Sequence, residues 1–451
     1  MDFERFQSIC PDCGRPVPAS YMRYDGGVYL IKICPEHGES CVLSSEDAKE
    51  FDRWIEYPSV TVPPAVSVTE GAKGGKWTEC PLHCGPCENH LMTACCVLLN
   101  VTDRCNQRCP YCFAEAEDSK SAPPDPPPSE IERWLDRLTE LGEERKFNIQ
   151  LSGGEPTVRE DLPEIIKMCK EKGFEYVQLN TNGRKLAVGP AYAKILKEAG
   201  LSTVFMQFDG VTDEVYFVLR SEPLLEIKKA AIENCGAAGL PVTLVPTVLK
   251  SVNLAQTGAI INFMLENIKT VKGVHFQPAS FFGRKPDGRN KEGDYDERVT
   301  MFAVMDEIEK QTGGRVRKAD LAPISTGHPL CCFCAAYMKE PDGLLRPLSG
   351  GGDCCSPADP LEIVRRDRDF VLNKWEVISP EEENYPANDG TALSFDEALA
   401  MFKSNMFTIS GMAFMDETNL DAERLRRCRV QVFSPDERLV PFCAYYSKGG
   451  K

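Results

Sequence analysis

Residues 97–112 read VLLNVTDRCNQRCPYC, an apolar run followed closely by three cysteines. The run VLLNVT has the composition of a buried β-strand. Cys105, Cys109 and Cys112 follow with CxxxCxxC spacing, which suits three irons of a cubane 4Fe–4S cluster and leaves the fourth iron open. The alternatives are a zinc site completed by a distant residue and a closed four-cysteine cluster. Because barrels gather their active sites at the carboxyl ends of their strands, the position of the motif favours the open cluster.

Further buried strands alternate with helical segments along the chain. Such alternation predicts right-handed βαβ units around a parallel sheet, and therefore an α/β fold. The expected strands are 97–102, 148–152, 176–180, 203–208, 242–248 and 273–278, and the expected helices are 129–142, 160–172, 186–199, 224–238 and 254–268. Six units are two short of a complete eight-fold barrel, so we expect a partial, TIM-like (β/α)6 barrel.

Four regions follow from this pattern. Residues 1–45 form a zinc-ribbon or rubredoxin-like unit, and 46–96 an irregular linker with its own cysteine group. Residues 97–285 form the barrel. Residues 286–451 form a cysteine-rich region for an auxiliary cluster or for substrate, beginning with an expected helix over 298–312.

Composition narrows the class of protein. The 451 residues carry 68 acidic and 52 basic side chains, a net charge of −16, which argues against a nucleic-acid partner. No run approaches the roughly 18 apolar residues of a membrane-spanning helix, and the start MDFERFQSIC lacks the build of a secretory signal. We therefore expect a soluble, cytoplasmic protein. In a reducing compartment most of its 21 cysteines predict metal ligands, whereas Cys169 and Cys235 are typical of buried core positions.

Two cysteine-containing knuckles lie in the first region. Residues 10–14 read CPDCG and residues 34–38 read CPEHG, separated by an expected strand pair that turns at 25–27. Two such knuckles present a tetrahedral set of ligands for zinc, with a mononuclear iron as the alternative. The expected ligands are Cys10, Cys13, Cys34 and His37.

Two further cysteine groups predict auxiliary 4Fe–4S clusters. The first is Cys80, Cys84 and Cys87 with Cys96, or Cys95 in its place, and a second zinc site is its alternative. The remaining cysteines are scattered, so either four of them hold a second auxiliary cluster or some stay free thiols. The set expected for that cluster is Cys331, Cys354, Cys428 and Cys443.

Together these motifs resemble those of radical S-adenosylmethionine (SAM) enzymes, over about residues 97–280. The second strand ends in SGGEP (152–156), similar to the family's GGE element, whose glycines admit a ligand and whose carboxylate suits the methionine ammonium. The resemblance implies that SAM binds the open iron and that one electron breaks its sulfur–carbon bond. The resulting 5′-deoxyadenosyl radical then abstracts hydrogen from an unactivated C–H bond. The implied SAM contacts are Phe113, Gly153, Gly154, Glu155, Asn180, Thr181, Asn182, Gln207, Asp209 and Thr247.

The order of the cysteine groups resembles a narrower subgroup, the tetraether-lipid-synthase-like radical SAM proteins, which also include pterin methylases. The shared features are the knuckles, the cysteines before the radical SAM loop, and the segments 410–428 and 441–445. The subgroup leads us to expect a cysteine near Gly411, where there is none. The last cluster therefore either borrows Cys354 or Cys355 or is absent.

The substrate stays open at this point. Residues 401–415, MFKSNMFTISGMAFM, are dense in Met and Phe. Flexible thioethers suit an apolar groove, so our main expectation is C–C bond formation on lipid alkyl chains, although the same residues also suit the core of a small domain. The alternatives are methylation of a pterin-like heterocycle and, in another class, an iron–sulfur electron carrier without turnover. His275, Gln277 and His328 are candidates to face either substrate.

The expected cofactors and partners follow from the resemblance. They are SAM, one SAM-binding and one or two auxiliary 4Fe–4S clusters, zinc or mononuclear iron, and a lipid or small-molecule substrate. An electron donor such as ferredoxin or flavodoxin is also implied, and peripheral contact with a membrane is compatible with a lipid substrate.

Overall fold

A computed structural model describes the chain at residues 6–65, 85, 87, 89–118, 120–142, 147–286, 297–348, 359–365 and 402–447. Within these residues the strands form two sheets. One is a small antiparallel sheet in the first region, and the other is a large sheet built from the barrel and the carboxyl-terminal region.

The amino-terminal sheet pairs four strands in chain order, β1 (Phe6–Ile9), β2 (Pro16–Tyr24), β3 (Gly27–Cys34) and β4 (Gly38–Ser45). The predicted turn is present, because Tyr24 pairs with Gly27 and the two residues between them, Asp25 and Gly26, have φ of 47° and 81°. Positive φ at both central residues is what a type I′ hairpin requires. The sequence indicated two strands in this region, and the structure has four.

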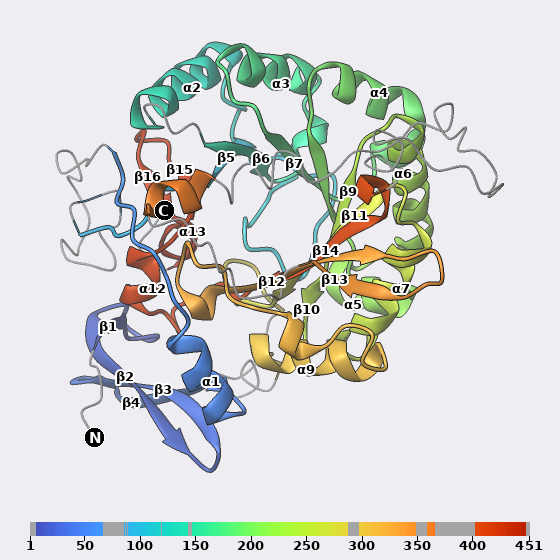
Figure 1. Cartoon of the computed structure of the whole chain (residues 1–451). Helices are drawn as coiled ribbons and strands as arrows, with labels where there is room; N and C mark the ends of the chain where they lie inside the picture. Colours follow the sequence, from blue (N-terminus) through green and yellow to red (C-terminus); the bar gives the residue numbers. More distant parts are fainter. Residues whose placement is uncertain are drawn as a thin grey trace.

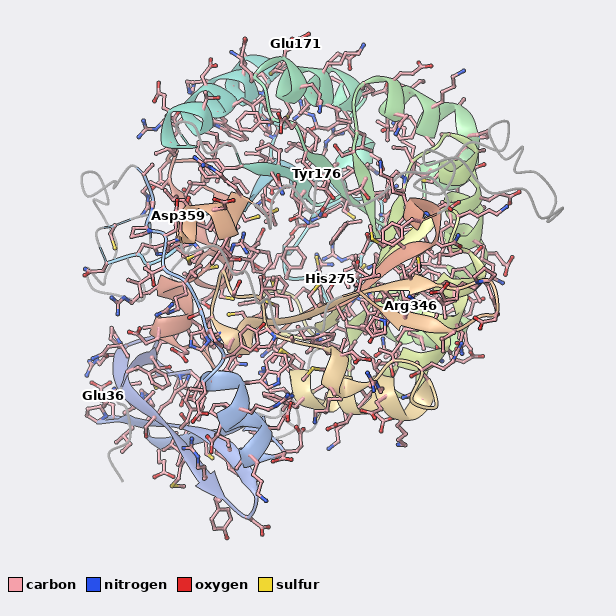
Figure 2. The ribbon with its side chains drawn as sticks, viewed as in Figure 1. Glu36, Glu171, Tyr176, His275, Arg346 and Asp359 are labelled. Carbon is pink, nitrogen blue, oxygen red and sulfur yellow. The ribbon has the colours of Figure 1, made fainter. Side chains whose placement is uncertain are left out.

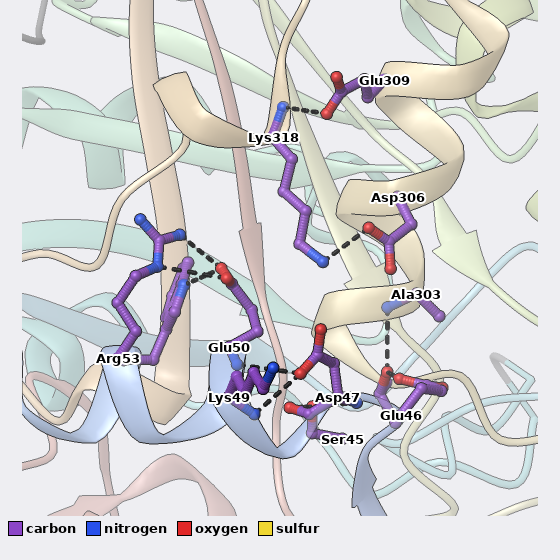
Figure 3. A network of polar contacts seen from close by, with 12 residues as sticks. Ser45, Glu46, Asp47, Lys49, Glu50, Arg53, Ala303, Asp306, Glu309 and Lys318 are labelled. Atoms are coloured by element: carbon purple, nitrogen blue, oxygen red, sulfur yellow. Dashed lines mark hydrogen bonds and ion pairs between the residues drawn. The ribbon is translucent and has the colours of Figure 1, made fainter. Parts of the chain in front are cut away.

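The segment after this sheet, expected to be irregular, begins with helix α1 (Ala48–Ile55). Asp47 caps the helix by accepting hydrogen bonds from the backbone N–H groups of Lys49 at 2.8 Å and Glu50 at 3.2 Å (Figure 3). This cap is a local sequence signal that the linker interpretation overlooked.

Helix α1 docks on helix α9 (Met301–Gln311), which lies within the predicted range 298–312. The ring centroids of Phe51 and Trp54 lie 6.4 and 5.5 Å from that of Phe302. These three rings are almost completely buried, so apolar packing fixes α1 to the segment that follows the barrel.

The six predicted barrel strands are present and lie side by side, each parallel to its neighbour. They are β5 (Cys96–Thr102), β6 (Asn148–Gly153), β7 (Val177–Thr181), β8 (Thr203–Gln207), β9 (Val242–Val245) and β11 (Val271–Pro278), with the short β10 (Thr247–Val248) paired to β11. The connecting helices are α2 (Pro128–Gly142), α3 (Leu162–Glu171), α4 (Pro190–Glu198), α5 (Asp213–Arg220), α6 (Leu225–Ala237) and α7 (Thr257–Glu266). Helix α5 was not predicted. The short 3-10 helices are η1 (Pro156–Val158), η2 (Leu186–Val188), η3 (Leu254–Gln256), η4 (Lys318–Asp320) and η5 (Pro329–Cys331).

The carboxyl-terminal region extends the large sheet at both edges. Its elements are β12 (Cys332–Lys339), β13 (Leu345–Pro347), β14 (Met406–Met412), α12 (Ala422–Arg426), β15 (Val430–Phe433), β16 (Leu439–Pro441) and α13 (Phe442–Tyr446). Among the described residues the strand order is β13-β12-β14-β11-β9-β8-β7-β6-β5-β15-β16. Strand β14 is parallel to β11, and β15 is parallel to β5. Each edge of the six predicted strands therefore gains a parallel strand that the sequence did not reveal.

Figure 1 shows the large sheet curving around a central space, with α2, α3, α4, α6 and α7 outside it. The amino-terminal sheet lies outside this ring, next to α12. Cys169 and Cys235 are 0% exposed in the apolar core, as predicted. No helix in the described part of the chain is both long and apolar enough to cross a membrane.

Candidate active site

The cysteine motif lies beyond the carboxyl end of β5 and lines a cavity of about 240 Å³. Backbone hydrogen bonds hold this loop on two sides. The Cys105 N–H donates to the Glu117 carbonyl at 2.8 Å, and Cys112 and Arg284 exchange two backbone hydrogen bonds of 3.0 Å each. Arg284 follows β11, so the loop is tied to the far end of the barrel, and its guanidinium also donates to the Cys109 carbonyl at 3.1 Å.

The three thiols of the motif suit a cluster better than a single ion. Cys105, Cys109 and Cys112 all line the cavity. Burial raises the pKa of Cys105 to about 12 and that of Cys109 above its ordinary value, and the charges of the neighbouring thiols add to both shifts. Among the described residues, only the amino-terminal quartet brings its ligand atoms within 4.8 Å of one another. At least one pair of the three sulfurs therefore lies more than 4.8 Å apart, as three corners of a cubane allow.

The glycines of the GGE element are required by the cysteine loop itself. Gly153 has φ of 120°, and a Cβ there would lie 2.1 Å from the Thr102 carbonyl oxygen. A Cβ at Gly154 would lie 2.3 Å from the Arg104 carbonyl oxygen. Close approach to a ligand was the reason expected for these glycines. The structure shows a second reason, because the tip of β6 packs directly on the backbone that leads into the cysteines.

Glu155 is 1% exposed, and its carboxylate joins the tips of β6 and β7. It accepts hydrogen bonds from the hydroxyls of Thr157 at 2.6 Å and Thr181 at 2.7 Å, and from the backbone N–H groups of Thr157 at 3.1 Å and Asn182 at 2.7 Å. These four hydrogen bonds satisfy the buried carboxylate. Glu155 therefore organises the cavity wall, in addition to any contact with an ammonium group.

The remaining strand-end residues also surround the cavity. Asn180, Thr181, Asn182, Gln207 and Thr247 line it, as does Phe113. They are accompanied by Gln150, whose amide N–H donates to the Asn180 side chain at 2.6 Å. Amide side chains offer both donors and acceptors, so this part of the wall is polar but uncharged.

Asp209 does not line the cavity; it holds Arg220, which does. It is 0% exposed and forms a two-pronged ion pair with Arg220 of α5, with N–O distances of 2.7 and 2.8 Å. Arg220 lines the cavity, donates to the Thr247 hydroxyl at 3.1 Å and to the Tyr111 carbonyl at 3.2 Å, and has its pKa raised by Asp209 against the effect of burial. No sequence motif pointed to Arg220. The acidic residue after the fourth strand, which requires a buried cation, was the available signal.

A second wall of the cavity is aromatic and comes largely from the carboxyl-terminal region. Phe282, Phe414 and Phe442 line it, with ring centroids 4.3 Å apart for Phe414 and Phe442 and 6.1 Å apart for Phe282 and Phe442. Phe113 lies 5.4 Å from Phe442. Sequence analysis did not assign Phe282, Phe414 or Phe442 to the site, because they follow three separate elements.

The Met- and Phe-rich segment does not form the apolar groove expected for lipid chains. Phe407 and Ile409 of β14 are 0% exposed, and Phe407 stacks on Tyr337 with ring centroids 5.5 Å apart. Met415 is likewise buried in an apolar cluster. Within the described part of this segment only Phe414 reaches the cavity. The alternative interpretation, that these side chains are core, fits the structure.

The three candidate polar residues, Gln277, His275 and His328, lie in different positions relative to the cavity. Gln277 lines the cavity, whereas His275, labelled in Figure 2, does not. The Nδ1 atom of His275 lies 2.9 Å from the hydroxyl of Ser410 on β14. His328 is half-buried near Arg424, and desolvation lowers its pKa to about 3. Neither of the two histidines lines the cavity.

The amino-terminal knuckles form a compact metal site. The ligand atoms of Cys10, Cys13, Cys34 and His37 all lie within 4.8 Å of one another. The Cys34 and Cys10 sulfurs lie 3.5 and 3.7 Å from His37 Nδ1. Backbone N–H groups of the knuckle and His37 lower the pKa of Cys34 to about 6, which favours the thiolate that a metal requires. This donor set fits a tetrahedral ion.

The late cysteines are partly brought together. Burial raises the pKa of Cys443 and of Cys428; the charges of Cys428 and Cys331 add to the shift at Cys443, and that of Cys331 adds to the shift at Cys428. Arg424 Nε donates to the Cys331 sulfur at 3.4 Å, and the Met415 N–H donates to the Cys443 sulfur at 3.2 Å. Cys354 and Cys355 lie outside the described residues. Three of the four expected ligands thus share one neighbourhood beside a buried arginine.

The linker cysteines are described only in part. Cys80 and Cys84 lie outside the described residues, whereas Cys87, Cys95 and Cys96 are described. Cys96 is the first residue of β5, and its thiol donates to the Gln150 side-chain oxygen at 3.3 Å. Because Gln150 lines the cavity, Cys96 is directed toward the barrel interior. The first auxiliary cluster stays a prediction.

Comparisons with known proteins agree with this geometry. A family model described as the radical SAM superfamily matches residues 99–264, and one described as the HMPTM N-terminal zinc ribbon domain matches residues 3–46. These ranges contain the cysteine loop with the strand ends, and the two knuckles, respectively. The chain belongs to the radical SAM superfamily.

Comparison with individual proteins is more specific than the family models. The chain is 35% identical to a 7,8-dihydro-6-hydroxymethylpterin dimethyltransferase of Methanocaldococcus jannaschii, over 97% of this chain and 92% of that protein. It is 32% identical to a probable GTP 3′,8-cyclase of Methanothermobacter marburgensis, over 58% of this chain and 86% of that protein. A crystal structure of Streptococcus suis SuiB bound to S-adenosylmethionine has 17% identity and a TM-score of 0.37, covering 47% of this chain and 44% of that one. A similarity this low supports no inference about this chain.

Proposed function

We propose that this protein is a radical SAM methyltransferase whose substrate is a pterin-like heterocycle. The observation that carries the proposal is the 35% identity to the pterin dimethyltransferase, which extends over 97% of the chain and therefore includes the regions outside the barrel. The cavity supports it. Its volume of about 240 Å³ is shared between an aromatic wall and a wall of amides, which suits a flat ring with polar edges.

The hypothesis that the substrate is a lipid alkyl chain loses the sequence feature that suggested it. Of the described residues in the segment that suggested an apolar groove, those of β14 are packed largely as core, and only Phe414 lines the cavity. The hypothesis that the protein is an iron–sulfur electron carrier is also disfavoured, because an electron carrier needs neither an open iron nor a ligand cavity beside it.

The residues around the cysteine loop have separate tasks in this proposal. When bound at Cys105, Cys109 and Cys112, a 4Fe–4S cluster supplies the electron that cleaves SAM. Arg220 presents a fixed positive charge in the cavity, which suits the carboxylate of SAM, and Asp209 holds that charge in place. The amides of Asn180, Asn182 and Gln207 offer hydrogen bonds to polar ligand edges. Phe414 and its aromatic neighbours exclude water from the reacting groups.

Two further metal sites complete the proposal. Zinc is the ion we assign to Cys10, Cys13, Cys34 and His37, since the donor set is tetrahedral and the matching family model is a zinc ribbon. For the carboxyl-terminal group we assign an auxiliary cluster to Cys331, Cys428 and Cys443, with Cys354 as the expected fourth ligand.

The proposal is tested with anaerobically reconstituted protein, dithionite, SAM and 7,8-dihydro-6-hydroxymethylpterin. We expect 5′-deoxyadenosine and a methylated pterin, identified by mass spectrometry. Cys109→Ala should abolish both products, whereas Cys41→Ala, which changes an exposed cysteine of β4, should leave both unchanged. Formation of 5′-deoxyadenosine without any methylated pterin would exclude this substrate class but keep the radical SAM assignment.

A further inference from the structure

The amino-terminal sheet is joined to the start of α12 by hydrogen bonds donated from its own side chains. All three acceptors lie within residues 417–421, a single turn of the carboxyl-terminal region. The contacts are Ser8 Oγ to the Leu420 carbonyl at 2.6 Å, Lys32 Nζ to the Glu417 carbonyl at 2.7 Å, and Tyr21 Oη to Asp421 Oδ2 at 2.8 Å. We refer to Ser8, Tyr21 and Lys32 as the ribbon donors.

Two of the ribbon donors lie directly beside the metal knuckles. Ser8 is 0% exposed and lies two residues before Cys10, and Lys32 is 1% exposed and lies two residues before Cys34. Lys32 Nζ also donates to the Ile9 carbonyl at 3.1 Å, next to the first ligand. The position of the Lys32 ammonium is therefore set by the backbone of both knuckles.

The sheet has little apolar core of its own. Its separate buried clusters are small, Cys10 with Val17 and Cys34 in one and Ala19 with Leu30 and Val42 in the other, while Ile9 and Val28 pack into the larger clusters of the rest of the chain. Structural zinc sites supply folding free energy to such units, which are unfolded without their ion. We therefore expect the geometry of the ribbon donors to depend on metal binding.

The accepting segment leads to the late cysteines. Asp421 is 1% exposed and caps α12, accepting from the Glu423 N–H at 2.8 Å and the Arg424 N–H at 3.3 Å. Arg424 then donates through Nε to the Cys331 sulfur at 3.4 Å and through Nη2 to the Ala413 carbonyl at 2.6 Å. Tyr21, Asp421, Arg424 and Cys331 form one continuous chain of polar contacts.

The same segment reaches the cavity. Ala413 is followed by Phe414, which belongs to the aromatic wall. The carbonyl that Arg424 holds is therefore adjacent to a residue that shapes the ligand space. A displacement of Arg424 would affect both Cys331 and Phe414.

We propose that the metal-bound amino-terminal sheet is an intramolecular clamp that positions Arg424 beside Cys331 and Phe414 in the cavity wall. Tyr21 and Lys32 are positioning residues that act through Asp421 and Glu417. The ribbon metal thereby controls the carboxyl-terminal cysteine group from outside the barrel, without taking part in the reaction. The clamp rests on the proposed function only in the experiment that measures a cluster at Cys331.

Hydrogen exchange measured by mass spectrometry on the full-length protein tests the clamp directly. Tyr21→Phe keeps the ring and removes the hydroxyl, and Tyr29→Phe on β3 of the same sheet is the matched control. We expect the amides of 418–426 to exchange about tenfold faster in Tyr21→Phe, because a hydrogen bond to a buried carboxylate is lost, and to be unchanged in Tyr29→Phe. Zinc content should equal that of wild type in both variants.

A ligand variant tests the dependence on metal. Cys13→Ser should lower the zinc content and accelerate exchange in 418–426 at least tenfold, with the amides of β7 and β8 unaffected. The proposal requires faster exchange in both Tyr21→Phe and Cys13→Ser. Unchanged protection of 418–426 in either variant overturns it.

The reduction potential of a cluster at Cys331 distinguishes a positioning role of Tyr21 from a packing role. If a cluster forms at Cys331, loss of the Arg424 hydrogen bond to its sulfur should lower the reduction potential of that cluster in Tyr21→Phe relative to Tyr29→Phe. An identical potential in the two variants overturns the positioning role of Tyr21. Failure of the proposed function would instead appear as wild-type protein that makes no methylated pterin, while the exchange difference persists.

Discussion

Gly154 packs against the backbone of Arg104, where a Cβ would lie 2.3 Å from the carbonyl oxygen and 2.7 Å from the carbonyl carbon. No side chain fits this gap, and Arg104 lies immediately before Cys105. The tip of β6 therefore acts as a template for the path of the cysteine loop.

Gly154→Ala should displace the cysteine loop and reduce the iron content of the reconstituted protein to well below half. We expect a loss of about 1–3 kcal/mol in the free energy of unfolding, since the new methyl overlaps backbone that cannot move freely. Gly189→Ala is the control, because a Cβ there meets no atom within 4 Å. Equal iron content in the two variants would contradict the template role.

Replacing Arg220 by Met should be strongly destabilising. Asp209 is 0% exposed, so removing its partner leaves a buried charge at a cost of about 3–5 kcal/mol. SAM affinity, measured by equilibrium binding, should fall as well. The control is Arg184→Met, which breaks the pair with Glu222 whose side chains are 31% and 34% exposed, at an expected cost of about 0–1 kcal/mol. Similar losses for the two variants would argue against a special role for the buried pair.

Lys272 should make stability rise with pH. It is 0% exposed, donates to the Ser404 carbonyl at 2.7 Å, and burial lowers its pKa to about 8. Because the ordinary value is about 10.4, the unfolded chain binds more protons than the folded chain between these values. The free energy of unfolding should therefore increase over about pH 8 to 10, by about 2–3 kcal/mol more in wild type than in Lys272→Met. Denaturant titrations at several pH values measure this difference, and Lys194→Met, at a side chain that is 72% exposed, should retain the wild-type slope.

Phe414→Leu should weaken binding of the heterocycle but not of SAM. Its ring lies 4.3 Å from Phe442, and loss of an aromatic face should raise KM for the pterin about three- to tenfold. Phe402→Leu changes a residue that is 36% exposed and should have no effect. A change in SAM affinity with an unchanged KM for the pterin would place Phe414 in the SAM site instead.

The parts of the fold that depend on local pattern were predictable. The βαβ alternation located all six barrel strands, and the CPxCG and CPxHG knuckles identified the four residues that the structure brings together as a compact quartet. Most of the strand-end residues lie around one cavity because the carboxyl ends of parallel strands meet at one edge. Their contacts with SAM stay a prediction.

The parts of the fold that depend on pairing between distant segments were not predictable from the sequence. Strands β14 and β15 each complete an edge whose partner lies more than a hundred residues away in the sequence, so nothing in their own composition revealed their place. Arg220 and Phe442 reach the cavity through tertiary packing rather than through a motif. The same limitation led to the lipid interpretation, since burial against a sheet and lining of a groove require similar side chains.

The placement of β14 and β15 has a consequence for how the cavity is completed during folding. Both edges of the six-stranded core, and with them Phe414, Val430 and Phe442 of the cavity lining, come from residues 406–442, about three hundred residues after the cysteine loop. The cysteine loop therefore stays open on this side until the distant strands dock, and their docking is the step that encloses the ligand space.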